Sequence, residues 1–252
     1  MFFRQEIVFG PIHSRRLGSS LGINLLPAKG KLCNFDCIYC ECGWNKDGKD
    51  DRSLPLPDDL STALEKKLSE CLRDGVEIDS ITFAGDGEPT LNPHFPEMVD
   101  IALALRDKYY PAASVSVLSN ATRVGKKEIF DALTKVDRPI MKIDAPSSEL
   151  VKRINRPVGK YSLEDVVESL KAFGGRFVLQ TMFLKSEDFD SSSPEVLEGW
   201  KKIVRELKPM EIMVYTVDRQ TPQEGLVKFS AARMEECVKD LIEEGYKINI
   251  KG

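Results

Sequence analysis

The sequence lacks long hydrophobic runs, a secretory leader and an excess of positive charge. No apolar segment approaches the roughly 20 residues that a membrane-spanning helix needs, so we expect no membrane insertion. The opening stretch "MFFRQEIVFGPIHSRRLG" has no basic start followed by an apolar segment and a small-residue cleavage site, which predicts a cytoplasmic protein. A net charge of −4 over 252 residues gives no basis for non-specific nucleic-acid binding.

The chain also lacks internal repeats, low-complexity tracts and an evident domain boundary. Hydrophobic residues make up 42% of it and charged residues 30%, which is typical of a globular protein with a buried core. We therefore expect a single domain over residues 1–252.

Short β-rich runs alternate with longer amphipathic ones along most of the chain. The pattern predicts strands at 20–27, 78–85, 114–120, 139–145, 177–184 and 211–217, and helices at 59–74, 95–109, 126–135, 162–173, 194–207 and 230–244. In the first helix, Leu60, Leu64, Leu68 and Leu72 recur every four residues, as on a helix that covers a sheet. About six βα units are too few for a closed eight-stranded barrel. The predicted fold class is α/β, a partial (β/α)6 TIM-like barrel with an open parallel sheet and outer helices.

Four of the six cysteines lie in one short stretch, "KLCNFDCIYCECGW". Cys33, Cys37 and Cys40 are spaced C-x3-C-x2-C, and Cys42 follows. In the cytosol disulfides are not expected, so this density indicates a metal or redox site. Thiolates suit iron–sulfur clusters or zinc, and three of them can bind three irons of a four-iron cluster while leaving the fourth open.

The connection that carries these cysteines, residues 28–58, is longer than an ordinary loop in a compact domain. Loops beyond about 12–15 residues are usually functional or disordered. We interpret this one as a functional, cluster-bearing loop.

Polar segments close most of the predicted strands, and one, at 180–183, lies within the fifth; parallel α/β sheets bind their ligands at the carboxyl ends of their strands. Gly85 and Gly87 would let the backbone approach a ligand closely. Lys142 and Asp144 are two apart on a predicted strand, so they would share a face and present opposite charges to a zwitterion. The segments are "GDGEPT" (85–90), "SNAT" (119–122), "KIDA" (142–145), "QTMF" (180–183) and "YTVDR" (215–219).

These residues resemble the radical S-adenosylmethionine (SAM) superfamily. The spacing of Cys33, Cys37 and Cys40 matches that family's cluster-binding motif, and Tyr39 before the third cysteine is typical of it. "GDGEP" is similar to the family's Gly-Gly-Glu motif, with Asp86 in place of a glycine. The resemblance covers almost the whole chain.

A closer likeness is to the subgroup of iron–sulfur oxidoreductases that includes the radical SAM enzyme of wybutosine biosynthesis. The stretches "FGPIHSRRLGSSLGINLLP", "FAGDGEPTLNP", "KIDAP" and "YTVDRQTP" carry this likeness. Members of the subgroup do not share one substrate. The wybutosine reaction itself is not expected here, because no extra cysteine set is evident.

The resemblance implies the cofactors and the chemistry. A [4Fe–4S] cluster would cleave SAM reductively to methionine and a 5′-deoxyadenosyl radical, which abstracts hydrogen from an unidentified substrate. A reductant such as flavodoxin or ferredoxin would supply the electron. The implied cluster ligands are Cys33, Cys37 and Cys40, and the implied SAM-binding residues are Tyr39, Gly85, Asp86, Gly87, Glu88, Asn120, Lys142, Asp144 and Gln180.

Simpler interpretations exist for several of these residues. The cysteines could form a structural zinc site with Cys42 as fourth ligand, although such sites usually have two separated pairs. Glu88 could cap the following segment, and Asn120 and Asp144 could be turn residues. Lys142 could pair with Asp144. Cys71 and Cys237 lie in predicted helices and are expected to be packing residues.

Five further residues are candidates for substrate contact. His13, Arg15 and Arg16 precede the first predicted strand and could bind a carboxylate or phosphate, or could be solvated. Tyr215 and Arg219 end the sixth strand. His94, at a predicted helix start, is expected to be structural.

Three function classes follow from the sequence. The first is a radical enzyme acting on a small molecule or nucleotide. The second is a radical modifier of RNA or of a partner protein, similar to an activase. The third is a non-catalytic iron–sulfur electron-transfer module, which would bind a cluster without turning over SAM.

Overall fold

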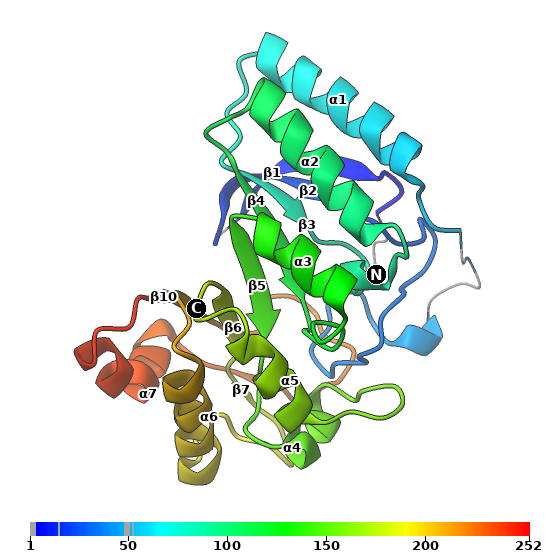
Figure 1. Ribbon diagram of the computed structural model, residues 1–252. Coiled ribbons are helices and arrows are strands. Elements are labelled where there is room, and N and C mark those ends of the chain that lie inside the picture. The colour runs from blue at the N-terminus through cyan, green and yellow to red at the C-terminus, as the bar shows by residue number, and fades with distance from the viewer. Residues whose placement is uncertain (1–3, 15, 48–50, 52) are drawn as a thin grey trace. The chain divides into compact units, whose positions relative to one another are not determined.

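The computed structural model describes residues 4–14, 16–47, 51 and 53–252 (Figure 1). It divides into two compact units. The first comprises residues 1–33, 45–119 and 126–139, and the second comprises residues 34–44, 120–125 and 140–252. The expected organisation as a single domain stays a prediction.

The first unit is a four-stranded sheet with helices. An antiparallel pair, β1 and β2, leads into the parallel strands β3 and β4. In Figure 1 the helices α1, α2 and α3 lie side by side along these strands, and α1 packs on α2 and α2 on α3. Its elements are β1 (Val8–Ser14), β2 (Gly18–Ile23), η1 (Asn45–Asp47), α1 (Pro57–Arg73), β3 (Ser80–Phe83), η2 (Pro89–Leu91), α2 (Phe95–Tyr109), β4 (Ser114–Ser119) and α3 (Lys127–Lys135).

The second unit is built on four parallel strands in the order β5-β6-β8-β10. The register places Lys142 of β5 beside Gln180 of β6, and Gln180 beside Met213 of β8. Two residues predicted for the site are thus neighbours on adjacent strands. The elements are β5 (Arg138–Lys142), which begins in the first unit, α4 (Ser148–Ile154), α5 (Leu163–Lys171), β6 (Val178–Met182), β7 (Leu184–Lys185), α6 (Pro194–Leu207), β8 (Glu211–Tyr215), β9 (Val227–Lys228), α7 (Ala231–Glu243) and β10 (Ile248–Lys251).

Serine side chains fix where several of these helices begin. The hydroxyls of Ser147, Ser162 and Ser230 accept hydrogen bonds from backbone N–H groups in the first turns of α4, α5 and α7. Each satisfies a donor that the helix itself leaves without a partner. The six predicted strands and six predicted helices all form, with ends shifted by a few residues.

The predicted leucine row on α1 is wrong at its last member. Leu60, Leu64 and Leu68 are fully buried, whereas Leu72 is 53% exposed. A step of four residues overshoots one turn by about 40°, so the fourth leucine lies about 120° around the helix from the first. Cys71 is buried in its place, as its predicted packing role requires.

Several short elements were absent from the predicted strands and helices. These are β1, α4, β10, the two-residue strands β7 and β9, and the three-residue helices η1 and η2. Most residues of β1 are half-buried or exposed, so its sequence carries no clear alternation. Among the described residues, no helix is both long and apolar enough to cross a membrane.

Candidate functional site

The "GDGEP" segment of the first unit follows β3 and pairs with the residue before Cys33. The N–H of Leu32 donates to the carbonyl of Asp86 at 3.0 Å, and the N–H of Glu88 donates to the carbonyl of Leu32 at 3.0 Å. Gly87 lies between these bonds with φ +145°, and a Cβ there would lie 1.8 Å from the Leu32 carbonyl oxygen. Only glycine allows this approach.

Both carboxylates of the segment are buried and hydrogen-bonded within the first unit. Asp86 accepts from the backbone N–H and from Nη1 of Arg4, each at 2.7 Å. Glu88 Oε1 accepts from the hydroxyls of Thr90 at 2.6 Å and Ser119 at 2.9 Å. The Asp86 carboxylate, which was predicted to contact SAM, is therefore bound to the N-terminal segment of the chain.

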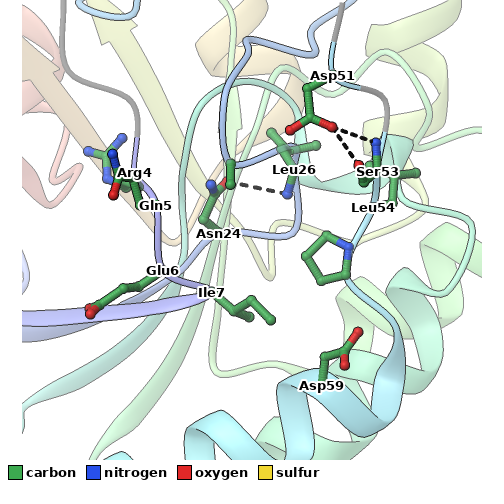
Figure 2. A pocket seen from close by; sticks show the side chains of 12 residues that line it. Arg4, Gln5, Glu6, Ile7, Asn24, Leu26, Asp51, Ser53, Leu54 and Asp59 are labelled. Atoms are coloured by element: carbon green, nitrogen blue, oxygen red, sulfur yellow. Dashed lines mark hydrogen bonds between the residues drawn. The ribbon is translucent and has the colours of Figure 1, made fainter.

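A cavity of about 260 Å³ lies next to Arg4 in the same unit (Figure 2). Arg4 and Asn24, which both contact Asp86, are part of its wall. Within the described part of the chain, the wall includes none of the predicted site residues. Its lining is Arg4, Gln5, Glu6, Ile7, Asn24, Leu26, Ala28, Asp51, Ser53, Leu54, Pro55 and Asp59.

The second unit contains Cys37 and Cys40 in a tight turn. The N–H of Cys40 donates to the carbonyl of Cys37 at 3.1 Å. The backbone on this turn is bonded on two sides, because Ile38 donates to Ile154 at 2.9 Å and accepts from Gln223 at 3.2 Å. Cys37 is buried, whereas Cys40 and Cys42 are half-buried. Cys33, also half-buried, belongs to the first unit.

A buried polar network fixes Tyr39, between these two cysteines. Its hydroxyl donates to Asp144 Oδ2 and accepts from Lys142 Nζ at 3.0 Å. Asp144 also accepts from Nδ2 of Asn155 at 2.7 Å and, through Oδ1, from the N–H of Met182 at 2.8 Å. β5 ends at Lys142, so Asp144 lies beyond the strand that was predicted to hold both; the two side chains meet at the Tyr39 hydroxyl instead.

Groups of this network change the pKa values of Cys37 and Lys142. Burial raises the pKa of the Cys37 thiol, while Lys142 and the hydrogen bond from Asn155 act in the opposite direction. Burial alone would lower the pKa of Lys142, but Tyr215, Asp144 and the two thiol groups raise it above its ordinary value. Lys142 is therefore a cation held 3.4 Å from the Tyr215 hydroxyl.

The side-chain amides of Gln180 and Asn120 differ in whether they have hydrogen-bond partners. Gln180 is 4% exposed, and its Nε2 has no hydrogen-bond partner among the residues that the structure describes. Asn120 donates to Asn34 Oδ1 at 2.7 Å and accepts from the Thr122 hydroxyl at 2.7 Å. Asn120 thus shapes its own turn and fixes a residue of the cysteine segment, whereas Gln180 has an unused donor.

The substrate candidates do not form one group. His13 is exposed on β1 of the first unit, Arg16 is half-buried in the turn that follows, and Arg15 lies outside the described residues. In the second unit, Tyr215 ends β8 and Arg219 pairs with Glu41 at 2.9 Å. His94, outside these sets, is the residue that precedes α2.

Three residues that contact the predicted site were not identified from the sequence. Arg4 and Asn24 contact Asp86 across 82 and 62 positions, and Asn155 contacts Cys37 across 118. Contacts between residues this far apart in the sequence leave no local motif by which they could be recognised. An asparagine directly after a short helix gives no sign of a contact with a cysteine turn.

We predict that Gly87→Ala is more destabilising than Gly75→Ala. Both glycines have positive φ, but a Cβ at Gly75 would have nothing within 4 Å. Gly75→Ala should cost about 1–2 kcal/mol of unfolding free energy for the left-handed backbone alone. Gly87→Ala should cost more, because it also breaks the pairing with Leu32. Urea denaturation of the metal-free proteins measures both, and equal losses would contradict the close approach.

Comparison with known proteins supports the fold and the family. The profile of the radical SAM superfamily matches residues 29–191. A UPF0026 protein of Methanocaldococcus jannaschii is 30% identical over 227 residues, which is 88% of this chain and 66% of that protein. A second, from Synechocystis, is 29% identical over 219 residues, covering 85% of this chain and 77% of that protein. This chain thus spans about two thirds of the first relative's length.

Solved structures with low sequence identity share the fold. A radical SAM methyltransferase from Sphaerobacter thermophilus superposes with a TM-score of 0.69 at 15% identity, over 92% of this chain and 65% of that one. SuiB of Streptococcus suis bound to S-adenosylmethionine gives 0.62 at 18% identity, over 94% and 48%. These likenesses confirm the predicted α/β partial barrel. The family profile and the fold together show that the chain belongs to the radical SAM superfamily.

Proposed function

We propose that this protein is a radical SAM enzyme that holds a [4Fe–4S] cluster on Cys33, Cys37 and Cys40 and uses S-adenosylmethionine to start a hydrogen abstraction. When bound, the reduced cluster would supply the electron that cleaves SAM to methionine and a 5′-deoxyadenosyl radical. The family implies an iron–sulfur cluster and SAM. The cluster type, these ligands and the reaction on substrate are our proposal.

The surroundings of Cys37 are the observation that carries the proposal. A thiolate ligand needs its negative charge offset when it is buried. Here the Asn155 amide nitrogen lies 3.4 Å from the sulfur, and the charge of Lys142 partly opposes burial, which raises the pKa of the thiol. A thiol that served only for packing would need neither. The donor set, thiolate sulfur, suits iron.

In the second unit, Gln180 offers a hydrogen-bond donor and Lys142 a positive charge to the polar groups of SAM. The buried donor of Gln180 lacks a partner within the described part of the chain, and a buried unsatisfied N–H costs free energy until an acceptor binds it. Lys142, its neighbour on β5, is kept positively charged by the groups around it. A carboxylate and a ribose hydroxyl are suitable acceptors for these two side chains.

Other residues have orienting roles in this proposal. The backbone of Gly85–Glu88 would face the methionyl amine, because the Asp86 side chain is bound to Arg4. Tyr39 and Asp144 hold the Cys37–Cys40 turn through their hydrogen bond. Both side chains are buried, as is the Cys37 side chain.

The finer assignments stay predictions. These are the subgroup with the wybutosine-biosynthesis enzyme, a flavodoxin or ferredoxin as reductant, and a substrate that is a small molecule, a nucleotide, an RNA or a protein. The electron-transfer module differs from the enzyme in one respect only, since it would not turn over SAM. The following experiment separates the two.

The proposal predicts deoxyadenosine formation that depends on Cys37 but not on Cys71. After anaerobic reconstitution with iron and sulfide and reduction with dithionite, the wild type should convert SAM to 5′-deoxyadenosine, measured by chromatography. Cys37→Ala should form none, because it loses a cluster ligand. Cys71→Ala is the matched control, since Cys71 is a buried cysteine of α1 and should retain the activity.

A cluster whose spectrum does not respond to SAM, together with no deoxyadenosine, would contradict the enzyme and leave the electron-transfer module. A spectral response without cleavage would indicate that substrate triggers the reaction. Equal loss of activity in Cys37→Ala and Cys71→Ala would contradict the assignment of Cys37 as a cluster ligand.

Gln180→Leu should weaken SAM binding about tenfold or more. A hydrogen bond to a charged group contributes about 1.5–3 kcal/mol. Thr181→Val is the control, because Thr181 is the next residue on β6 and its hydroxyl bonds to Ile143 and Trp200 instead. Anaerobic calorimetry with the reconstituted proteins measures both affinities. The role of Gln180 is wrong if its variant binds SAM as tightly as Thr181→Val does.

A further inference from the structure

The side-chain amide of Asn155 donates a hydrogen bond to the sulfur of Cys37, one of the proposed cluster ligands. Asn155 directly follows α4 and is 1% exposed. Its Nδ2 lies 3.4 Å from Cys37 Sγ, 3.0 Å from the Tyr39 hydroxyl oxygen and 2.7 Å from Asp144 Oδ2. A single nitrogen thus faces three acceptors.

The three acceptors compete for the two hydrogens of the amide nitrogen. The Tyr39 oxygen already accepts from Lys142 and gives its own hydrogen to Asp144. The Asp144 carboxylate and a metal-bound sulfur can only accept. The Asn155 amide nitrogen therefore donates one hydrogen to Asp144, and the Tyr39 oxygen and the Cys37 sulfur share the other.

The main chain of Asn155 holds the same loop. Its carbonyl accepts from the N–H of Asp36 at 2.8 Å, and the carbonyl of Ile154 accepts from the N–H of Ile38 at 2.9 Å. These bonds lie on either side of Cys37. The side-chain amide is thus fixed beside the sulfur by its own backbone, so little entropy is lost when it donates.

We propose that Asn155 is a positioning residue that orients the Cys37 sulfur and, by donating an N–H···S hydrogen bond, raises the reduction potential of the cluster. This inference rests on the proposed function. Hydrogen bonds to the sulfurs are among the factors that set iron–sulfur potentials. The bond withdraws negative charge from the thiolate, so the cluster accepts an electron more readily.

The test compares Asn155→Ala with Asn92→Ala. Asn92 is equally buried, at 0% exposure, and also donates two side-chain hydrogen bonds, to the carbonyls of Leu25 and Pro55. Asn92 lies in the first unit, and its amide nitrogen is bound to these two carbonyls. Both variants and the wild type are reconstituted anaerobically. Iron content and the one-electron midpoint potential, followed by electron paramagnetic resonance, are then measured without substrate.

The expected result is a more negative potential for Asn155→Ala and an unchanged one for Asn92→Ala. A tenfold smaller equilibrium constant for reduction corresponds to about 59 mV for a one-electron couple. Equal potentials in cluster-loaded proteins would overturn this inference alone. A wild type that binds no cluster would overturn the proposed function and this inference with it.

A serine variant covers the case in which Asn155→Ala does not retain iron. Asn155→Ser keeps an O–H donor on a side chain that is one bond shorter. Iron retention by the serine variant, with a potential nearer to the wild-type value, supports the donor role. Loss of iron from both variants, with a larger fall in unfolding midpoint than Asn92→Ala shows, would assign Asn155 to folding and overturn the proposal.

Discussion

One buried carboxylate organises the cysteine turn of the second unit. Asp144 accepts hydrogen bonds from Tyr39 in the turn, from Asn155 after α4 and from the backbone of Met182 at the end of β6. A buried charge is tolerated only when such partners surround it. Because each partner comes from a different element, satisfying Asp144 places the turn, the helix end and the strand end together.

The nearby lysine follows from the same constraint. Lys142 lies beside two thiols and a carboxylate, and these groups keep it charged in spite of its burial. A cation at this position lowers the free energy of a thiolate at Cys37. Lys142 therefore places a positive charge near the buried Cys37 sulfur before any cluster is bound, and this charge partly opposes the effect of burial.

In the first unit, the predicted site segment is ordered by a close approach of two backbone segments. The residue before Cys33 pairs with the "GDGEP" segment only because Gly87 has no side chain, and the Asp86 carboxylate is neutralised by Arg4. The two units thus order their own predicted site residues by different means. In the first, a glycine permits backbone pairing; in the second, hydrogen bonds to Asp144 fix a turn.

Sequence patterns predicted the features that depend on local periodicity. Strand and helix alternation identified the main elements, and the cysteine spacing identified the ligands that we propose. Gln180, which lies within the fifth predicted strand, was named as a candidate because of the resemblance to the radical SAM superfamily. Helix geometry explains the error at Leu72, since a four-residue repeat leaves the apolar face within a few turns. Asn155 and Arg4 were missed because their contacts depend on tertiary packing across 118 and 82 positions.

The most direct test of the central claim, a cluster with three cysteine ligands and one open iron, is Mössbauer spectroscopy of the protein reconstituted with iron-57. The account predicts that adding SAM changes the spectrum of one iron of a four-iron cluster and leaves the other three unchanged. A spectrum that SAM does not alter, or that shows four equivalent irons before and after, would contradict it.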